Sequence, residues 1–219
     1  MTFHQQLEAA TVAERNALMD LPIVASALAG RVDRGQYLRF LGRAFHHVKH
    51  TPSLLMACGA RLGAEREWLR RAVVHYVEEE VGHHEWILSD IDAAGGDAEA
   101  VRGGEPDFDT RLMVSYAYDT TNRANPVGLF GMIYVLEGTS VALASTLAVT
   151  LAAALDLPAR AFTYLSSHGS LDRSHMRFFA ETVDRLEDER DRACVEGCAR
   201  DFFRLYGNVL RGIGDGVQA

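Results

Sequence analysis

Cysteine is scarce in this sequence of 219 residues, which contains three cysteines and no C-x-x-C pair. An odd number of cysteines argues against a disulfide framework, so we expect a protein of the reducing cytoplasm. We interpret Cys58, Cys194 and Cys198 as small, buried, apolar residues.

Positive charge is also in short supply. Lysine and arginine together number 22 against 30 acidic residues, and Lys49 is the only lysine. The resulting net charge of −8 argues against electrostatic binding to nucleic acid. The first residues lack a basic region followed by an apolar stretch, so we expect no signal peptide. We expect a small-molecule substrate and a homodimer.

Strand patterns are missing as well. Apolar residues recur at spacings of three and four almost throughout, which is typical of amphipathic helices. The sequence therefore predicts an all-α protein, a single domain over residues 1–219 with roughly seven or eight helices. Its Gly-rich end, residues 211–219, is expected to be frayed.

The expected helices begin and end at recognisable signals. Asp33 is an N-cap candidate, and Pro52 is expected to bend or interrupt the helix that begins after Asp33. Asn125-Pro126 is a strong helix start. Residues 95–109 form the one clear loop. The expected helical ranges are 3–18, a second helix from about 34 that Pro52 bends or interrupts, 64–93, 110–121, 126–155, a short helix after Leu157-Pro158, 170–186 and 188–210.

Residues 126–158 are apolar enough to span a bilayer, with Glu137 and Asp156 as their only charges. A charge in the middle of the segment and the lack of basic flanks argue against a membrane span. A central helix surrounded by other helices has the same composition. We therefore predict a core helix and no membrane span.

The triplet His168-x-x-x-Asp172-x-x-His175 gives the sharpest chemical signal. Steps of four and three residues place all three side chains on one face of a helix. Two imidazoles and a carboxylate suit iron or manganese with coordination positions left open. The alternative is a polar helix face near a helix terminus.

A second set of candidate ligands lies in the segment EEEVGHHEW. Glu80 and His83 have the i, i+3 spacing by which helical bundles present a carboxylate and an imidazole to a shared metal pair. Glu79 or His84 can replace them, because the register is open. A solvated charged face is the alternative interpretation.

Glu137 completes the set as the lone charge in the middle of an apolar helix. A buried carboxylate is costly unless it is paired, hydrogen-bonded or bound to a metal, so a buried Glu–Arg pair is the alternative. Glu80, His83, Glu137 and the triplet together would hold two divalent ions.

Other candidates are weaker. His46, His47 and His50 fall in FHHVKHTP, and they bind haem or metal, line the substrate pocket, or are ordinary packed histidines. Tyr76 and Tyr134 lie one or two helical turns from proposed ligands, where they donate electrons or hydrogen bonds or simply pack in the core.

With these motifs the chain resembles the haem-oxygenase-like di-iron oxidases, relatives of the TenA, PqqC and CADD proteins. The Glu80–His83 spacing is most similar to the branch that contains the undecene-forming fatty-acid oxidase. The resemblance implies a seven-helix fold, two Fe(II) ions and dioxygen as co-substrate. It also implies oxidative cleavage or decarboxylation of a small carboxylate, such as a fatty acid or an amino-acid derivative.

Four other functions fit the same fold. A haem oxygenase would use His46 or His47 as the axial ligand, and a TenA-like hydrolase needs a cysteine nucleophile. A PqqC-like oxidase works without metal and would use the histidines as acids and bases. A non-catalytic binding protein would keep the polar residues as a buried network.

Overall fold

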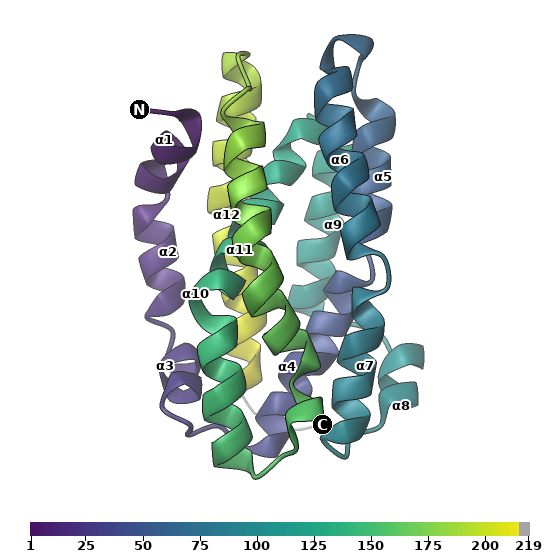
Figure 1. The fold of residues 1–219 in the computed structure, drawn as a ribbon, viewed down its shortest axis with the longest axis vertical. Helices are drawn as coiled ribbons and strands as arrows, with labels where there is room; N and C mark the ends of the chain where they lie inside the picture. The colour runs from purple at the N-terminus through teal and green to yellow at the C-terminus, as the bar shows by residue number, and fades with distance from the viewer. Residues whose placement is uncertain (215–219) are drawn as a thin grey trace.

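The protein folds as a bundle of helices that run roughly along one long axis (Figure 1). The structure is a computed structural model that describes residues 1–214, except for the side chains of residues 169–173. No strand occurs in this part of the chain, so the all-α prediction is confirmed. The α-helices are α1 (Phe3–Ala10), α2 (Val12–Met19), α3 (Pro22–Leu28), α4 (Arg34–Val48), α5 (Thr51–Arg61), α6 (Glu67–Glu80), α7 (His83–Ala93), α8 (Ala98–Gly103), α9 (Phe108–Asn122), α10 (Leu129–Leu155), α11 (Thr163–Val183) and α12 (Glu189–Gly214). Short 3-10 helices cover Ala64–Arg66, Pro126–Gly128 and Ala159–Ala161.

Two of the expected helix starts have the side-chain chemistry that the sequence indicates. Asp33 caps α4 and forms a capping box with Gln36. The Asn125 side chain accepts a hydrogen bond from the backbone of Val127, and Pro126 follows at the first helical position. The helix that begins after Asp33 is also interrupted near Pro52, which lies in the first turn of α5.

The helices are more numerous than the expected seven or eight for three reasons. Two predicted helices are broken, α3 forms between two predicted ranges, and α8 forms inside the predicted loop. The first break is at Thr11, whose hydroxyl donates a hydrogen bond of 2.8 Å to the carbonyl of Leu7. Such a bond to the preceding turn bends a helix. The predicted loop at residues 95–109 contains α8, whose first turn is capped by Asp97.

The second break separates α6 from α7 at Val81 and Gly82. Gly82 has a φ of +92°, in the left-handed region where glycine carries no Cβ penalty. An added Cβ would meet nothing within 4 Å, so the backbone conformation and not space requires glycine here. Glu80 therefore ends one helix and His83 begins the next, whereas the sequence predicted one continuous helix.

Helix α11 is longer than predicted. It begins at Thr163 and not near residue 170, so the candidate ligands His168 and His175 lie within one continuous helix. Helix α12 continues to Gly214, which corrects the expected fraying of residues 211–214, and residues 215–219 lie outside the described part.

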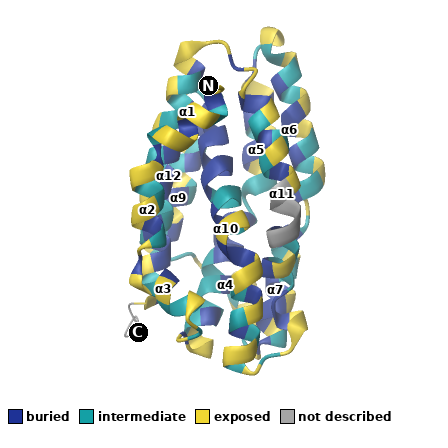
Figure 2. Ribbon diagram, turned by 60° about the vertical axis from the view of Figure 1, so that its left-hand side comes forward, coloured by how far each residue is buried: buried dark blue, intermediate teal, exposed yellow. Residues whose placement is uncertain are grey.

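Helix α10 is central only along its first half. Residues 129–135 are buried, whereas Val141 and Val149 in the second half are exposed (Figure 2). Together with the preceding turn it forms Pro126–Leu155, a helix long and apolar enough to cross a membrane by length and composition, with 22% of its most apolar window buried. The expectation that other helices surround it along its whole length is therefore wrong for the second half.

A buried carboxylate ties α7 to α11. Asp90 is fully buried and accepts hydrogen bonds from the backbone N–H groups of Thr163, at 2.9 Å, and Tyr164, at 2.8 Å. These are unsatisfied donors of the first turn of α11, and a negative charge there is stabilised by the helix dipole. Asp90 on α7 thus fixes where α11 begins.

We expect Asp90→Ala to lower the free energy of unfolding by about 2 kcal/mol, the upper end for loss of a helix cap, because two buried donors lose their acceptor. Asp97→Ala removes the exposed cap of α8 and should cost about half as much. Urea denaturation of both variants measures the difference. Equal losses would contradict the proposed tie between α7 and α11.

Candidate metal centre

Four helices bring carboxylates and imidazoles together inside the bundle. Helices α6 and α7 supply Glu80 and His83, α10 supplies Glu137, and α11 supplies His168 and His175. Two groups have ligand atoms within 4.8 Å of one another: Glu80 with His83 and His168, and Glu80 with Glu137 and His175. Five of the six predicted ligands therefore converge, and we call them the ligand cluster.

Glu80 is shared by both groups. One carboxylate oxygen, Oε2, lies 3.1 Å from His83 Nδ1, and the other, Oε1, lies 3.9 Å from His175 Nδ1. Burial raises the pKa of Glu80, but the hydrogen bond from His83 and the charges of the surrounding histidines outweigh it and hold the pKa below its usual value. Glu80 is therefore an anion that faces two sets of imidazoles.

The ring of His168 is oriented by its own helix. Its Nδ1 donates a hydrogen bond of 3.2 Å to the backbone carbonyl of Tyr164, which leaves Nε2 for another partner. The rings of His168 and His83 meet edge to face, with centroids 4.9 Å apart. Trp86 stacks on His83 at 4.1 Å and covers this side of the ligand cluster.

His175 lies between three carboxylates. Its Nδ1 is 3.6 Å from Glu137 Oε1, and its Nε2 is 2.7 Å from Glu79 Oε2. A carboxylate on the outer nitrogen of a metal-binding histidine fixes its tautomer and the direction of its ring. Glu79, an alternate ligand in the sequence analysis, is thus placed behind His175, outside both groups of ligand atoms.

The remaining candidates are placed as follows. The side chain of Asp172 lies outside the described residues. His84 points away from the ligand cluster, with its Nε2 3.3 Å from Glu85 and its ring against Phe45. The structure therefore brings His83, and not His84, to Glu80.

The two candidate tyrosines differ in their surroundings. Tyr76 is buried with its ring edge to face against His175, at 6.2 Å between centroids. The hydroxyl of Tyr134 instead lies 3.1 Å from Arg15 and 3.3 Å from Thr11, on the side of α1 and α2. Tyr134 thus packs among the N-terminal helices, and only Tyr76 contacts the ligand cluster.

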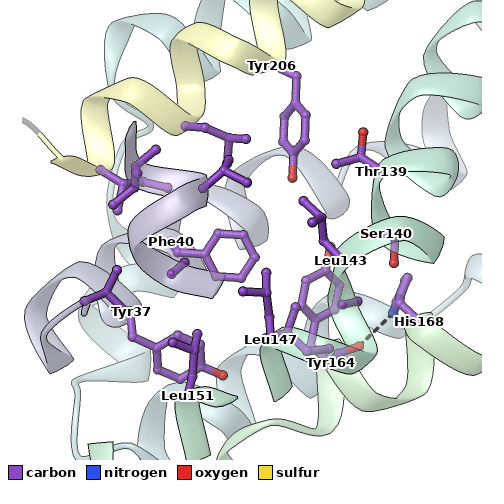
Figure 3. A pocket seen from close by; sticks show the side chains of 18 of the residues that line it. Tyr37, Phe40, Thr139, Ser140, Leu143, Leu147, Leu151, Tyr164, His168 and Tyr206 are labelled. Carbon is purple, nitrogen blue, oxygen red and sulfur yellow. Dashed lines mark hydrogen bonds between the residues drawn. The ribbon is translucent and has the colours of Figure 1, made fainter. Parts of the chain in front are cut away.

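A cavity of about 110 Å³ opens beside the ligand cluster, with His168 in its wall (Figure 3). It lies between α3, α4, α10, α11 and α12, and most of its lining is aliphatic. Among the three candidate pocket histidines, His47 lines the cavity. His46 contacts Lys49 at 3.3 Å and His50 contacts the Tyr118 hydroxyl at 3.1 Å, and neither reaches the cavity.

Sequence reasoning missed several polar residues of the cavity wall, among them Thr139, Ser140 and Tyr206. Ser140 lies three residues after Glu137, so helical spacing alone could have placed it on the same face of α10. No sequence feature marked Tyr206 as a cavity residue, because its segment has the ordinary pattern of an amphipathic helix.

All three cysteines are free and none lines the cavity. Cys58 donates to the carbonyl of Pro126, and burial raises its pKa to about 12. Cys194 contacts the carbonyl of Asn125. The structure therefore offers no thiol nucleophile beside the cavity.

The chain belongs to the iron-containing redox enzyme family, whose family model matches residues 38–206. The family prediction made from the motifs is confirmed. No curated protein shows significant sequence similarity to the chain.

Solved structures show that the fold is haem-oxygenase-like. A domain of unknown function from Shewanella denitrificans has a TM-score of 0.86 at 20% identity, over 100% of this chain and 94% of that one. A TenA homologue from Pseudomonas syringae has a TM-score of 0.83 at 12% identity, over 97% and 93%. A haem oxygenase from Leptospira interrogans has a TM-score of 0.77 at 16% identity, over 97% and 100%.

The buried position of His47 predicts a pH dependence. Burial, with smaller effects of neighbouring histidines, lowers the pKa of His47 to about 4. In the unfolded chain His47 becomes protonated near pH 6.5, whereas in the folded chain it stays neutral down to about pH 4. The free energy of unfolding therefore falls as the pH drops from about 6.5 to about 4.

The contribution of His47 to that fall is about 3 kcal/mol. Urea denaturation at pH 7 and pH 4.5 should therefore show a smaller loss in His47→Leu than in the wild type. The partly exposed His84→Leu is the control, and it should keep most of the loss. An identical pH dependence in wild type and His47→Leu would show that His47 is protonated at no cost.

Proposed function

We propose that the protein is a non-haem di-iron enzyme that activates dioxygen to oxidise a small carboxylate. The observation that carries the proposal is the shared position of Glu80 between two buried groups of ligand atoms. A carboxylate with one imidazole on each oxygen is suited to bridge two ions. A cytoplasmic location and a homodimer belong to the same proposal.

The chemistry of the donors fits iron. Three imidazoles and two carboxylates are borderline and hard ligands of the kind that bind Fe(II) with positions left open. His168 is held by Tyr164 and His175 by Glu79, so both rings are oriented before a metal arrives. Asp172, whose side chain is outside the described residues, is proposed as a sixth ligand from its spacing to His168 and His175.

When bound, iron supplies the electrons that reduce dioxygen beside the substrate. The protein's own residues bind the substrate, orient it and exclude water from the site. Trp86 covers one side of the ligand cluster, and the aliphatic residues of the cavity hold the carbon chain of the substrate next to His168. Tyr76 is in position to supply a hydrogen bond or an electron at His175.

The alternative functions have less support. A cavity of about 110 Å³ is smaller than the benzene-sized cavity of about 150 Å³ known from engineered cores, and haem is several times larger than benzene. A TenA-like hydrolase would need a thiol in the cavity wall, where none of the three cysteines lies. The remaining alternative is a PqqC-like oxidase that works without metal, and measuring the iron content of the protein distinguishes it from the di-iron enzyme.

We expect His175→Ala to abolish iron binding, because its imidazole faces both Glu80 and Glu137. His84→Ala changes a histidine that faces away from the ligand cluster and should bind iron like the wild type. Iron per chain is measured after anaerobic loading with Fe(II) and removal of free metal. Unchanged iron content in His175→Ala would contradict the site, and an iron-free wild type would favour the metal-independent oxidase.

Glu79→Ala tests the support behind His175. Loss of such a carboxylate typically weakens metal affinity about 10- to 100-fold. Glu78→Ala changes the exposed neighbour on the same helix and should leave the affinity unchanged. Competition with a chelator for Co(II) or Fe(II) gives both affinities. If the two variants bind equally well, Glu79 has no role in holding His175.

A further inference from the structure

Two polar side chains of the cavity wall, the buried His47 and the partly buried Tyr206, make no hydrogen bond to another described residue. His47 is 9% exposed and makes a ring contact with Tyr206, at 6.1 Å between centroids. The hydroxyl of Tyr206 points into the cavity (Figure 3). Polar groups buried in this way are normally hydrogen-bonded, so their placement calls for a partner in the cavity.

These two residues are not part of the ligand cluster. His47 comes from α4 and Tyr206 from α12, and neither helix contributes a residue to the ligand cluster. The polar groups of the cavity wall therefore include the His47–Tyr206 pair as well as His168, Thr139 and Ser140, with aliphatic side chains such as Leu143 and Leu147 also in the wall.

The character of the pair limits what it can bind. Burial keeps His47 neutral, so its imidazole offers one donor and one acceptor, and the Tyr206 hydroxyl offers both. Among the described side chains that line the cavity there is no lysine, arginine, aspartate or glutamate. A charged group at this place would be buried without a counter-charge, which is costly, whereas a neutral hydroxyl or amide would satisfy both residues.

We propose that the cavity binds an aliphatic acid with a second, uncharged hydrogen-bonding group, a hydroxyl or an amide, and that His47 and Tyr206 recognise this second group. The place of the carboxylate at the ligand cluster rests on the proposed function. The recognition of the second group does not, because it depends on the cavity wall alone. An unsubstituted acid of the same length would leave His47 and Tyr206 unpaired, which is how buried polar groups reject an analogue.

Two series of probe molecules test the recognition of the uncharged group separately from the binding of the carboxylate at the ligand cluster. Hexan-1-ol and hexane-1,6-diol, with their four- to eight-carbon relatives, are titrated calorimetrically into metal-free protein. The corresponding alkanoates and ω-hydroxyalkanoates are titrated both into metal-free protein and into protein loaded anaerobically with Fe(II). At the best chain length we expect the extra hydroxyl to tighten binding about tenfold in both series, the effect of one good hydrogen bond.

Tyr206→Phe and His47→Leu should each bring this ratio close to one, by weakening the hydroxylated probe and not the plain one. Tyr37→Phe is the matched control. Tyr37 also lines the cavity, but its hydroxyl already donates to the Ala161 carbonyl at 2.6 Å, so the ratio should stay unchanged. Tyr206→Phe alone suffices if His47→Leu does not fold.

A ratio of one at every chain length in the wild type, or a ratio that Tyr206→Phe leaves intact, would overturn the proposal. If the neutral probes show the preference and the acids do not bind to iron-loaded protein, the polar pair is upheld and the proposed iron function fails. If the acids bind only with iron and without preference for the hydroxyl, the iron function stands and the polar pair is overturned.

Discussion

A carboxylate inside an apolar bundle must be compensated, and Glu80 is the carboxylate on which this structure depends. Its side chain is 9% exposed, and burial alone would push it toward the neutral form. His83 contacts one carboxylate oxygen of Glu80 and His175 faces the other, so the anion is stabilised from two sides. Because these histidines come from α7 and α11, compensation of one charge requires three helix segments to meet at one place. A metal pair would satisfy the same requirement more fully, which is why the ligand cluster is persuasive as a metal centre and not only as a buried network.

The backbone is arranged to permit that meeting. Gly82, with its φ of +92°, ends α6 immediately after Glu80 and lets α7 begin with His83. Further along α7, Asp90 caps α11, and His168 follows in the second turn of that helix. The ligand cluster is thus flanked by a sharp turn on one side and a helix cap on the other. Neither residue is a candidate ligand, yet both determine where ligands lie.

The sequence predicted the helical class, the family and most of the convergent residues, because those depend on local spacing and on residue type. Helix starts with a side-chain cap, such as Asp33 and Asn125, were also found. The break at Gly82 was missed because a lone glycine is tolerated inside a helix and its positive φ shows only in three dimensions. The same break decides between His83 and His84, since periodicity along one continuous helix no longer applies. The contact of Glu79 with His175 depends on how α6 packs against α11, and the position of Tyr206 beside His47 depends on how α12 packs against α4. Residue spacing within one helix does not predict packing between two helices.

The charges of the ligand cluster and the neutrality of the cavity have a joint consequence. Glu80 and Glu137 would repel a substrate carboxylate as long as the histidines were their only partners. The described part of the cavity wall offers no arginine or lysine to offset that repulsion. Under the proposed function, the metal supplies the counter-charge that the described wall residues lack, and we expect the acid to bind after the metal. An aliphatic wall then adds affinity without orientation, since apolar contacts are non-directional. Orientation must come from directional groups, and His47 and Tyr206 are two neutral groups of the cavity wall that do not belong to the ligand cluster.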